Sequence, residues 1–325
     1  MITRRRLAEI RMLAQGREVA VVGDLMLDEF LAGTVERISP EAPVPVLTFE
    51  SNRYVLGGAG NAARTLAALG AKASLVGLVG GDPAGQALRD EALSEGMDVA
   101  GLVQAPRRTT TLKTRIIAQT QQVVRIDREA SGTVGPAVRR DVKQAALAAI
   151  DSADAVLVSD YDKGAVPVAL ARELVERSRL RGVPCVVDSK AVHTAFRGAT
   201  VLTPNVGELA RMARAHAVSE KDISRAAAVV LRRLALEALL VTRSEAGMSL
   251  FAAGAERVDI PALATEVRDV TGAGDTVAAV IALGLASGLD LAEAARLATL
   301  AAAVVVRKVG TAAPSWDEMT ALAEE

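Results

Sequence analysis

Short runs of apolar, β-branched residues alternate along this chain with longer stretches in which apolar residues recur every three or four positions. Runs of the first kind predict buried strands, and stretches of the second kind predict amphipathic helices. The predicted strands are residues 19–23, 73–79, 155–159, 184–188, 201–203 and 239–242. The predicted helices are residues 1–13, 61–69, 138–150, 168–181 and 224–236. This alternation predicts an α/β fold, a mostly parallel central sheet flanked by helices, with ligands at the carboxyl ends of the strands.

Two segments, residues 29–56 and 109–127, break this rhythm because their apolar and polar positions alternate. The first also contains Pro40, Pro43 and Pro45, which disfavour a helix. We expect the two segments to form a small separate β-sheet, a lid on the main domain. No low-complexity linker or internal repeat divides the chain, so we expect one domain over residues 1–325. The apolar edge of the lid at residues 44–49 predicts a homodimer joined lid to lid.

Composition narrows the class of protein further. Half of the 325 residues are apolar but only 2% are aromatic, which favours an α/β core of Ala, Val and Leu over a β-sandwich. A net charge of -1 gives no global field for nucleic acid or an anionic membrane, and the longest apolar stretch, residues 277–289, is too short to span a bilayer. The single cysteine, Cys185, lies among valines and predicts a buried thiol in a reducing compartment. We therefore expect a cytoplasmic protein without nucleic-acid or membrane partners.

The most informative stretch, residues 269–276, reads Asp-Val-Thr-Gly-Ala-Gly-Asp-Thr and runs directly into an apolar helix. Gly272 and Gly274 allow a tight turn in which several N–H groups and a helix N-terminus point at one place, where an anion such as a transferring phosphoryl group is stabilised. Asp275 could accept a proton there from an incoming hydroxyl group. The alternative is that Asp275 only caps the helix.

A second glycine-rich turn, at residues 57–61, reads Gly-Gly-Ala-Gly-Asn. Gly58, Gly60 and Ala63 satisfy the dinucleotide pattern G-x-G-x-x-A, and Asp82 lies roughly twenty residues further on. A nicotinamide or flavin oxidoreductase is therefore a rival interpretation. Against it, this turn does not follow the first predicted strand of the chain.

Polar residues follow several other predicted strands and should meet at one edge of the sheet. Asp24 and Asp28 could bind sugar hydroxyls, or they could only form turns. Lys190 could neutralise nucleotide phosphate. Asn205 and Glu208 could position phosphate, magnesium and water, or they could form a helix cap with Glu208 at its third position.

Three common catalytic signatures do not occur in the sequence. There is no Gly-x-x-x-x-Gly-Lys-Ser/Thr, which excludes a P-loop enzyme, and no Gly-x-Ser-x-Gly elbow. His193 and His216 are the only histidines, and one cysteine cannot complete a zinc site with them. Any nucleotide phosphates must therefore be held in another way.

Taken together, the turn at 57–61, Asn205 with Glu208, and residues 272–275 resemble the ribokinase-like (PfkB) sugar kinases in order and spacing, over nearly the whole chain. Residues 38–46, 159–165 and 240–249 look like the corresponding segments of the heptose 7-phosphate kinases. The resemblance implies ATP- and Mg²⁺-dependent phosphorylation of the anomeric hydroxyl of D-glycero-D-manno-heptose 7-phosphate to the 1,7-bisphosphate, a step toward the ADP-heptose of lipopolysaccharide core. A kinase of another sugar, sugar phosphate or nucleoside is the alternative.

The resemblance also implies roles for individual residues. The base and its anion hole are Asp275, Gly272, Ala273 and Gly274. The residues that bind ATP are Lys190, Asn205, Val206, Gly207, Glu208, Thr242, Ser244 and Gly247, with Glu208 acting on Mg²⁺ indirectly. The sugar side comprises Asp24, Asp28, Gly57, Gly58 and Asn61. Cations that could hold the 7-phosphate, or only form a solvated surface, are Arg37, Lys113, Arg115, Arg125 and Lys163. A monovalent cation such as K⁺ is implied near Asp269 and Thr271.

Two positions depart from the family pattern. The usual Asp-Pro-Lys has serine at Ser189, and the Ala-Asn-Ala of the adenine pocket has threonine at Thr299. These departures bear on nucleotide preference rather than on catalysis. Relatives with two activities continue into a nucleotidyltransferase domain, whereas this chain ends at Glu325 without a His-x-Gly-His motif. We therefore expect only the kinase step, with no adenylyltransferase domain.

Overall fold

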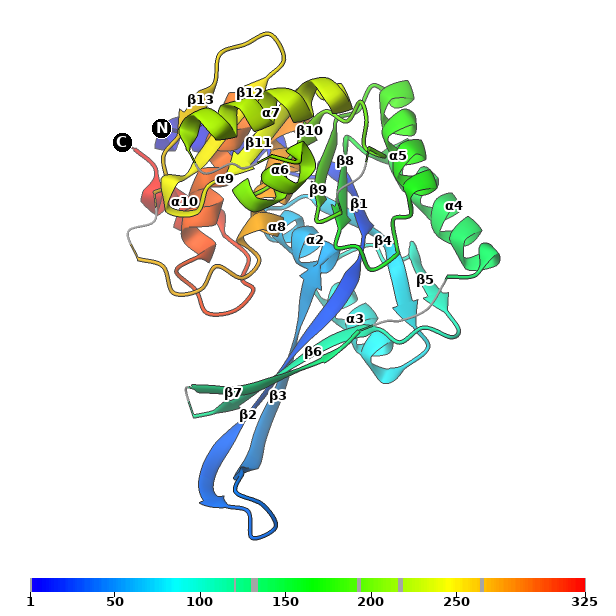
Figure 1. The fold of residues 1–325 in the computed structure, drawn as a ribbon, viewed down its shortest axis with the longest axis vertical. Coiled ribbons are helices and arrows are strands. Elements are labelled where there is room, and N and C mark those ends of the chain that lie inside the picture. The colour runs from blue at the N-terminus through cyan, green and yellow to red at the C-terminus, as the bar shows by residue number, and fades with distance from the viewer. Residues whose placement is uncertain are drawn as a thin grey trace.

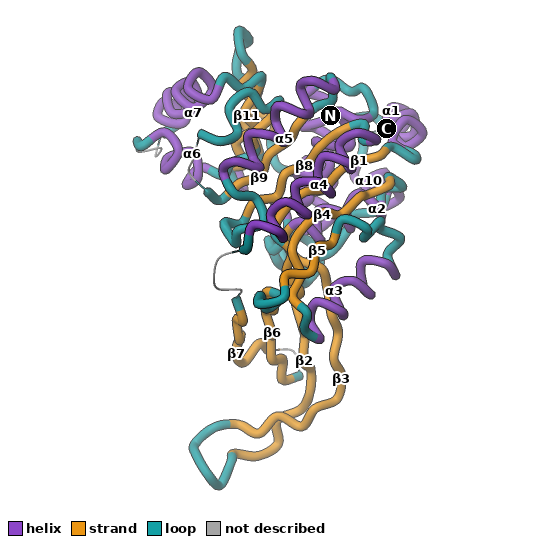
Figure 2. The backbone as a smooth tube through the Cα atoms, turned by 90° about the vertical axis from the view of Figure 1, so that its right-hand side faces the viewer, coloured by secondary structure: helices purple, strands orange, loops and turns teal. Residues whose placement is uncertain are grey.

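The computed structural model describes residues 2–119, 121–129, 134–191, 194–215, 219–263 and 266–324. The two histidines, His193 and His216, lie outside these residues. Within the described residues, nine strands form one sheet and four strands form a second sheet (Figure 1). The larger sheet carries the helices, and the smaller one extends from one end of it (Figure 2).

The main sheet has the strand order β13-β12-β11-β10-β9-β8-β1-β4-β5. Its strands are β1 (Glu18–Gly23), β4 (Lys72–Gly80), β5 (Leu102–Ala105), β8 (Ala155–Asp160), β9 (Cys185–Ser189), β10 (Val201–Leu202), β11 (Ala238–Thr242), β12 (Met248–Ala252) and β13 (Val258–Ile260). In this order, every pair of neighbours from β11 to the β5 edge is parallel. The strand β12 is antiparallel to both β11 and β13. The predicted parallel sheet is confirmed, and the antiparallel edge is an addition that the sequence pattern did not indicate.

Helices cover both faces of this sheet. They are α1 (Arg4–Ala14), α2 (Ala59–Ala68), α3 (Pro83–Ser94), α4 (Pro136–Ser152), α5 (Val168–Arg181), α6 (Val206–Ala213), α7 (Glu220–Leu234), α8 (Ala273–Ala286), α9 (Leu291–Val305) and α10 (Trp316–Leu322). Side chains of β1 alternate between two separate cores: Val19 and Val21 pack with α1, α2, α8 and α9, while Ala20 and Val22 pack with α4 to α7. None of the helices that the structure describes is long and apolar enough to cross a membrane.

Cys185 lies at the start of β9 and is fully buried. Burial raises the pKa of its thiol to about 12, so the thiol is not ionised at neutral pH. This confirms the prediction of a buried structural cysteine.

The four-stranded sheet is the predicted lid, and its strand order is β3-β2-β6-β7. Its strands are β2 (Leu25–Ile38), β3 (Pro45–Gly58), β6 (Thr111–Ala118) and β7 (Gln121–Arg128). One residue, Asp24, separates β1 from β2, and β3 leads into α2 with no residue between them. The lid is therefore joined to the main sheet through continuous secondary structure rather than through a linker.

The position of β3 decides between the two interpretations of the turn at residues 57–61. A dinucleotide fingerprint requires a strand, a turn and a helix within a parallel β-α-β unit. Here the preceding strand, β3, belongs to the lid and pairs antiparallel with β2. The oxidoreductase interpretation is therefore wrong.

Candidate active site

Asp275, in the first turn of α8, is 4% exposed and is held by residues from two other elements. Its Oδ1 accepts a hydrogen bond of 2.6 Å from the hydroxyl of Tyr161, which follows β8. Its Oδ2 accepts one of 3.0 Å from Nδ2 of Asn61, on α2. The N-cap residue of α8 is Gly272, and Asp275 makes no capping bond. The interpretation of Asp275 as a helix cap is therefore wrong.

The surroundings of Asp275 make its carboxyl group a suitable base. Burial, together with the negative charge of Asp188, raises its pKa to about 7, against the hydrogen bonds from Tyr161 and Asn61 and the charge of Lys190. A general base works best when its pKa lies near the operating pH. Asp275 can therefore take a proton at neutral pH and release it afterwards.

The turn before α8 has a geometry that only glycine tolerates at Gly272. This residue has φ +79°, and a Cβ there would lie 2.5 Å from Nδ2 of Asn61. At Gly274 no atom lies within 4 Å of the corresponding position, so that side of the turn is open. The first N–H groups of a helix have no partner within the helix and attract anions. The N–H of Ala273 donates to the backbone oxygen of Val270 at 3.2 Å, so a candidate anion site beside Asp275 depends on the neighbouring N–H groups of this turn.

Asp24 lies directly after β1, as expected, and its carboxylate is bound by backbone N–H groups of the loop after β8. It is 1% exposed, and its Oδ2 accepts hydrogen bonds from the backbone N–H groups of Tyr161 and Lys163 at 2.8 and 3.0 Å. Its Oδ1 accepts one from the N–H of Ala165 at 2.9 Å. Asp24 therefore anchors the loop that carries Tyr161, a contact that favours a structural role over the predicted contact with a sugar.

The other predicted sugar-side residues lie together at the root of the lid. Asp28 is 3% exposed, and its Oδ1 lies 2.6 Å from Nη1 of Arg115. A Cβ at Gly57 would lie 3.1 Å from Oδ2 of Asp28, and Gly58 has φ +58° with the backbone oxygen of Asp24 only 2.6 Å from where its Cβ would be. The two glycines therefore let β3 approach the carboxylate of Asp28 and the backbone of Asp24 closely.

One face of the lid carries most of the predicted cations. In the sheet register Asp28 pairs with Lys113, Lys113 with Asp127, and Arg115 with Arg125, and residues paired in this way face the same side. Asp127 lies 3.8 Å from Nζ of Lys113 and 2.7 Å from Nε of Arg125. In the structure these cations are thus already paired with carboxylates.

The two remaining predicted cations differ in position. Nζ of Lys163 lies 2.7 Å from Glu129, beside the anchored loop. Arg37, in contrast, pairs with Val46 near the far end of β2, about 30 Å beyond Asp28 at the usual rise of a strand. The structure therefore does not bring Arg37 together with the other predicted site residues.

Arg108 is a basic residue of this region that the sequence interpretation missed. Its Nη2 donates a hydrogen bond of 2.5 Å to the backbone oxygen of Lys163, and it makes no ion pair with any residue that the structure describes. The group is partly desolvated, which lowers its pKa, while the charge of Asp24 acts in the opposite direction. Arg108 lies one residue before the predicted lid boundary, so a boundary drawn earlier would have included it.

Lys190 and the start of α6 form the other side of the site. Asn205 and Glu208 make a reciprocal capping box, with both hydrogen bonds at 2.8 Å, and Val206 and Gly207 form the first turn between them. The capping alternative is therefore confirmed. Glu208 Oε1 nevertheless lies 3.3 Å from Nζ of Lys190. The cap and the cation belong to one cluster.

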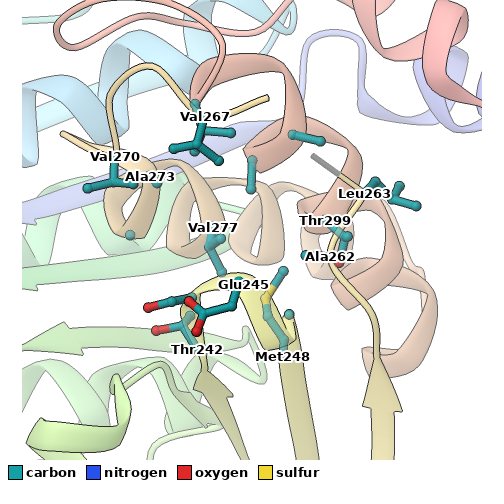
Figure 3. Close-up of a pocket in the computed structure, with 16 residues that line it drawn as sticks. Thr242, Glu245, Met248, Ala262, Leu263, Val267, Val270, Ala273, Val277 and Thr299 are labelled. Atoms are coloured by element: carbon teal, nitrogen blue, oxygen red, sulfur yellow. The ribbon is translucent and has the colours of Figure 1, made fainter. Parts of the chain in front are cut away.

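A cavity of about 470 Å³ lies beside Gly274 (Figure 3). Its walls are mostly apolar and include three of the residues predicted to bind ATP, Thr242, Ser244 and Gly247. The other lining residues are Glu245, Met248, Ala262, Leu263, Val267, Val270, Ala273, Val277, Thr299, Ala302, Ala303 and Val306. A cavity of this size and polarity fits a planar heterocyclic base with polar groups at one end.

The two departures from the family pattern are both satisfied locally. The Ser189 hydroxyl donates to Oδ2 of Asp160 at 2.8 Å. The Thr299 hydroxyl donates to the backbone oxygen of Ala295, one turn earlier in α9, at 3.0 Å. The hydrogen of Thr299 is thus used within its own helix and is not directed at a ligand in the cavity.

The residues considered for metal ions are carboxylates at two places. Oδ1 of Asp269 accepts from both the N–H and the hydroxyl of Thr271, and Oδ2 accepts from the N–H of Gly310, so protein groups already brace this loop. Oδ2 of Asp188 is buried and has no hydrogen-bond partner in the described part of the chain, close to Glu208. Three or more metal-binding side chains do not converge anywhere in the described ranges. Asp188 and Glu208 fit a hydrated magnesium ion better than a fully coordinated one.

The relatives that this chain resembles in sequence are longer than the chain. The bifunctional protein HldE of Geobacter sulfurreducens is 47% identical over 300 residues, which are 92% of this chain and 61% of the relative. The bifunctional protein HldE of Caulobacter vibrioides is 44% identical over 319 residues, 98% of this chain and 65% of the relative. The chain thus spans less than two thirds of the length of these relatives.

Solved structures share the fold over almost the entire chain. A ribokinase of Arabidopsis thaliana, complexed with ribose and ATP, has a TM-score of 0.75 at 21% identity and covers 96% of this chain and 100% of its own. Phosphofructokinase-2 of Escherichia coli, in complex with potassium, has a TM-score of 0.78 at 20% identity, with 95% and 98% covered. Residues 17–318 also match the sequence model of the pfkB family of carbohydrate kinases. Since that match spans the main sheet, the lid and the turn that carries Asp275, this chain belongs to the pfkB family of carbohydrate kinases and is a phosphotransferase.

Proposed function

We propose that this chain transfers the γ-phosphoryl group of ATP to the anomeric hydroxyl of D-glycero-D-manno-heptose 7-phosphate and so forms the 1,7-bisphosphate. The observation that carries the proposal is the buried base Asp275, with its pKa near 7, at the helix N-terminus between the root of the lid and the cavity. The choice of sugar is supported by relatives named bifunctional protein HldE and by the segments similar to heptose phosphate kinases. The product would serve ADP-heptose synthesis.

In the proposed reaction, Asp275 accepts the proton of the anomeric hydroxyl while that oxygen attacks the γ-phosphorus and ADP leaves. The N–H groups at the turn of Gly272 to Gly274 stabilise negative charge on the transferred group. Asn61 keeps the carboxylate of Asp275 in place, and Asp28 accepts hydrogen bonds from the sugar hydroxyls. Closure of the lid excludes water, which would otherwise compete with the sugar as the acceptor.

ATP is proposed to bind with its base in the cavity near Thr242, Ser244 and Gly247. Its phosphates then run past Lys190 and the start of α6 toward Gly274. Asp188 and Glu208 would hold Mg²⁺ beside these phosphates, and the ion would supply positive charge to neutralise the leaving group. A monovalent cation near Asp269 and Thr271 would add to the hydrogen bonds that already brace their loop.

The 7-phosphate is proposed to bind on the cationic face of the lid. Lys113, Arg115, Arg125 and Lys163 are paired with carboxylates in the structure, so a phosphate would have to compete for them. Arg108 has no such pair among the described residues and lies beside Lys163. A guanidinium group suits phosphate because it can donate two parallel hydrogen bonds. Arg108 is therefore the cation that phosphate would engage at the lowest cost.

The lid is also proposed to join two copies of the chain. Ile38, Val44 and Phe49, near its tip, are 62%, 51% and 61% exposed. An exposed apolar strand edge is a ready surface for pairing with a second copy. The single buried thiol fits the reducing conditions of the cytoplasm, where we propose that the protein works.

The test is ADP release in the presence of magnesium, measured with D-glycero-D-manno-heptose 7-phosphate, unphosphorylated heptose, ribose, fructose, fructose 6-phosphate and adenosine. We expect rapid turnover on the heptose phosphate alone, and a loss of several orders of magnitude in Asp275→Asn with retained ATP binding. Turnover on another member of the panel would keep the kinase and replace the sugar. Near-normal turnover of Asp275→Asn would overturn the mechanism.

A further inference from the structure

Tyr161 contacts the site through its hydroxyl, its backbone N–H and its ring. Its hydroxyl donates to Oδ1 of Asp275 at 2.6 Å, and its backbone N–H donates to Asp24. Nζ of Lys190 lies 5.4 Å from the centre of its ring. On another side, a Cβ at Gly58 would lie 3.6 Å from the ring. The ring is therefore held in one orientation, with its hydroxyl directed at the proposed base.

The two donors to Asp275 act on different oxygens. Tyr161 holds Oδ1 and Asn61 holds Oδ2, so the plane of the carboxylate is fixed at both ends. A carboxylate oxygen can accept two hydrogen bonds, so each oxygen keeps one position for a substrate hydroxyl. The contact with Tyr161 therefore orients the base and leaves it open to substrate.

Charged groups surround this pair from several elements. Asp188 on β9 disfavours a charge on Asp275, while Lys190, which follows the same strand, favours it. Glu208 on α6 lies beside Lys190. Burial, then the charge of Asp275, raises the pKa of Tyr161 well above its usual value. Tyr161 thus stays protonated and keeps a hydrogen to donate to Asp275.

We propose that Tyr161 is a positioning residue for phosphoryl transfer: its hydroxyl holds the carboxylate of Asp275 in the reactive orientation. This inference rests on the proposed function, in which Asp275 is the base. A hydrogen bond donated to a carboxylate stabilises its charged form. Without that donor, a buried Asp275 would hold its proton up to a higher pH and would no longer be fixed at Oδ1.

The first test compares Tyr161→Phe with Tyr54→Phe, since the chain has only these two tyrosines. Phe keeps the ring of Tyr161 and removes only its hydroxyl. Tyr54 lies on β3, packed against the core, and provides the matched control. We expect the acid limb of kcat/KM in Tyr161→Phe to move up by about one pH unit or more, with activity at pH 7 reduced about fivefold or more and largely recovered near pH 9. Tyr54→Phe should keep the wild-type profile.

Titrations of ATP and of the sugar phosphate are common to all three proteins and cancel in this comparison. A Tyr161→Phe profile that coincides with the wild type, or a kcat/KM above it at pH 7, would overturn the proposal. The second result would mean that the hydroxyl blocks the acceptor position. Circular dichroism and the melting temperature check that both variants are folded.

The second test needs no substrate and therefore separates this inference from the proposed function. Protein labelled with ¹³C at the tyrosine Cζ should give two resonances, and Tyr161→Phe identifies the one from Tyr161. We expect that resonance to shift with a midpoint near pH 7 in the wild type and to lose this transition in Asp275→Asn. No transition in the wild type, or the same transition in Asp275→Asn, would show that Tyr161 does not sense the carboxylate. If this transition is observed but the protein has no kinase activity, the contact between Tyr161 and Asp275 is supported and only the proposed function is refuted.

Discussion

Gly272→Ala should damage stability and catalysis through two separable effects. At φ +79° an alanine is strained by about 1–2 kcal/mol relative to glycine. In addition, the new Cβ would lie 2.5 Å from Nδ2 of Asn61, which is buried and cannot swing into solvent. Moving Asn61 breaks its hydrogen bond to the carboxylate of Asp275, which is worth about 1.5–3 kcal/mol for a charged acceptor. The total loss of stability is therefore about 2.5–5 kcal/mol.

The matched control is Gly288→Ala, just beyond the other end of α8. Gly288 has φ +81°, and nothing lies within 4 Å of where its Cβ would be, so this variant carries the strain without the clash. With an unfolding entropy of about 2.1 cal/mol/K per residue, each 1 kcal/mol lost from the free energy of unfolding lowers the melting temperature of this 325-residue chain by about 1.5 °C. The melting temperature should thus fall by about 2–3 °C in Gly288→Ala and by about 4–8 °C in Gly272→Ala.

The kinetic comparison isolates the contact with Asn61. A misplaced base lowers kcat/KM by about 100-fold, so we expect that loss in Gly272→Ala and less than a twofold change in Gly288→Ala. Differential scanning calorimetry and ADP release on the same samples give both quantities. If the two variants matched within threefold in kcat/KM, the inference that Gly272 is needed to admit Asn61 would be refuted.

Four further outcomes follow from contacts described above. Asp275→Asn should melt about 1–4 °C higher than the wild type at pH 8, because the raised pKa of Asp275 makes its buried charge costly above pH 7. The difference in melting temperature should be smaller at pH 5.5, since that cost declines as the pH falls. An equal difference at both pH values would contradict this. Asp24→Asn should lower the melting temperature by about 3–6 °C, whereas a sugar-binding role would raise the sugar KM and leave stability unchanged. Arg108→Gln should raise KM for the sugar phosphate about 10- to 100-fold, with KM for ATP unchanged and no effect on an unphosphorylated sugar; equal effects on both sugars would exclude a phosphate contact. Phe49→Asp should reduce the mass in light scattering to that of one 33.7 kDa chain, and an unchanged mass would place any dimer contact elsewhere.

Local patterns in the sequence sufficed for six parallel strands of the main sheet and for the turn that carries Asp275, but not for β5, β12 or β13. The β-branched runs mark the strands because both faces of a parallel sheet are buried. The glycines at 272 and 274 mark a tight turn because few other residues accept its backbone angles. Chemistry that depends on residues close together in the chain is therefore readable without a structure.

Such local patterns could not identify the contacts of Tyr161, Arg108 and Asp24. Tyr161 lies 114 residues before Asp275, and no local feature marks its hydroxyl as the partner of that carboxylate. Asp24 and Asp28 are the same residue type four positions apart. Only the break between β1 and β2 turns Asp24 toward the backbone of the loop after β8, while Asp28 continues along the lid. Which of two similar side chains meets a ligand is decided by tertiary contacts.

The strands β2 and β3 are continuous with the main domain at one end, and their length places the tip of the lid far from its root. Each strand has 14 residues, or about 46 Å, and the residues of the site occupy only the root. Register shifts between Ala32 and Gly33 and between Val35 and Arg37 lie beyond that root. Residues added to or removed from the turn at 39–44 therefore leave the pairing of Asp28 with Val55 unchanged. Changes at the tip can therefore alter the proposed contact between two copies while the proposed sugar site at the root keeps its geometry.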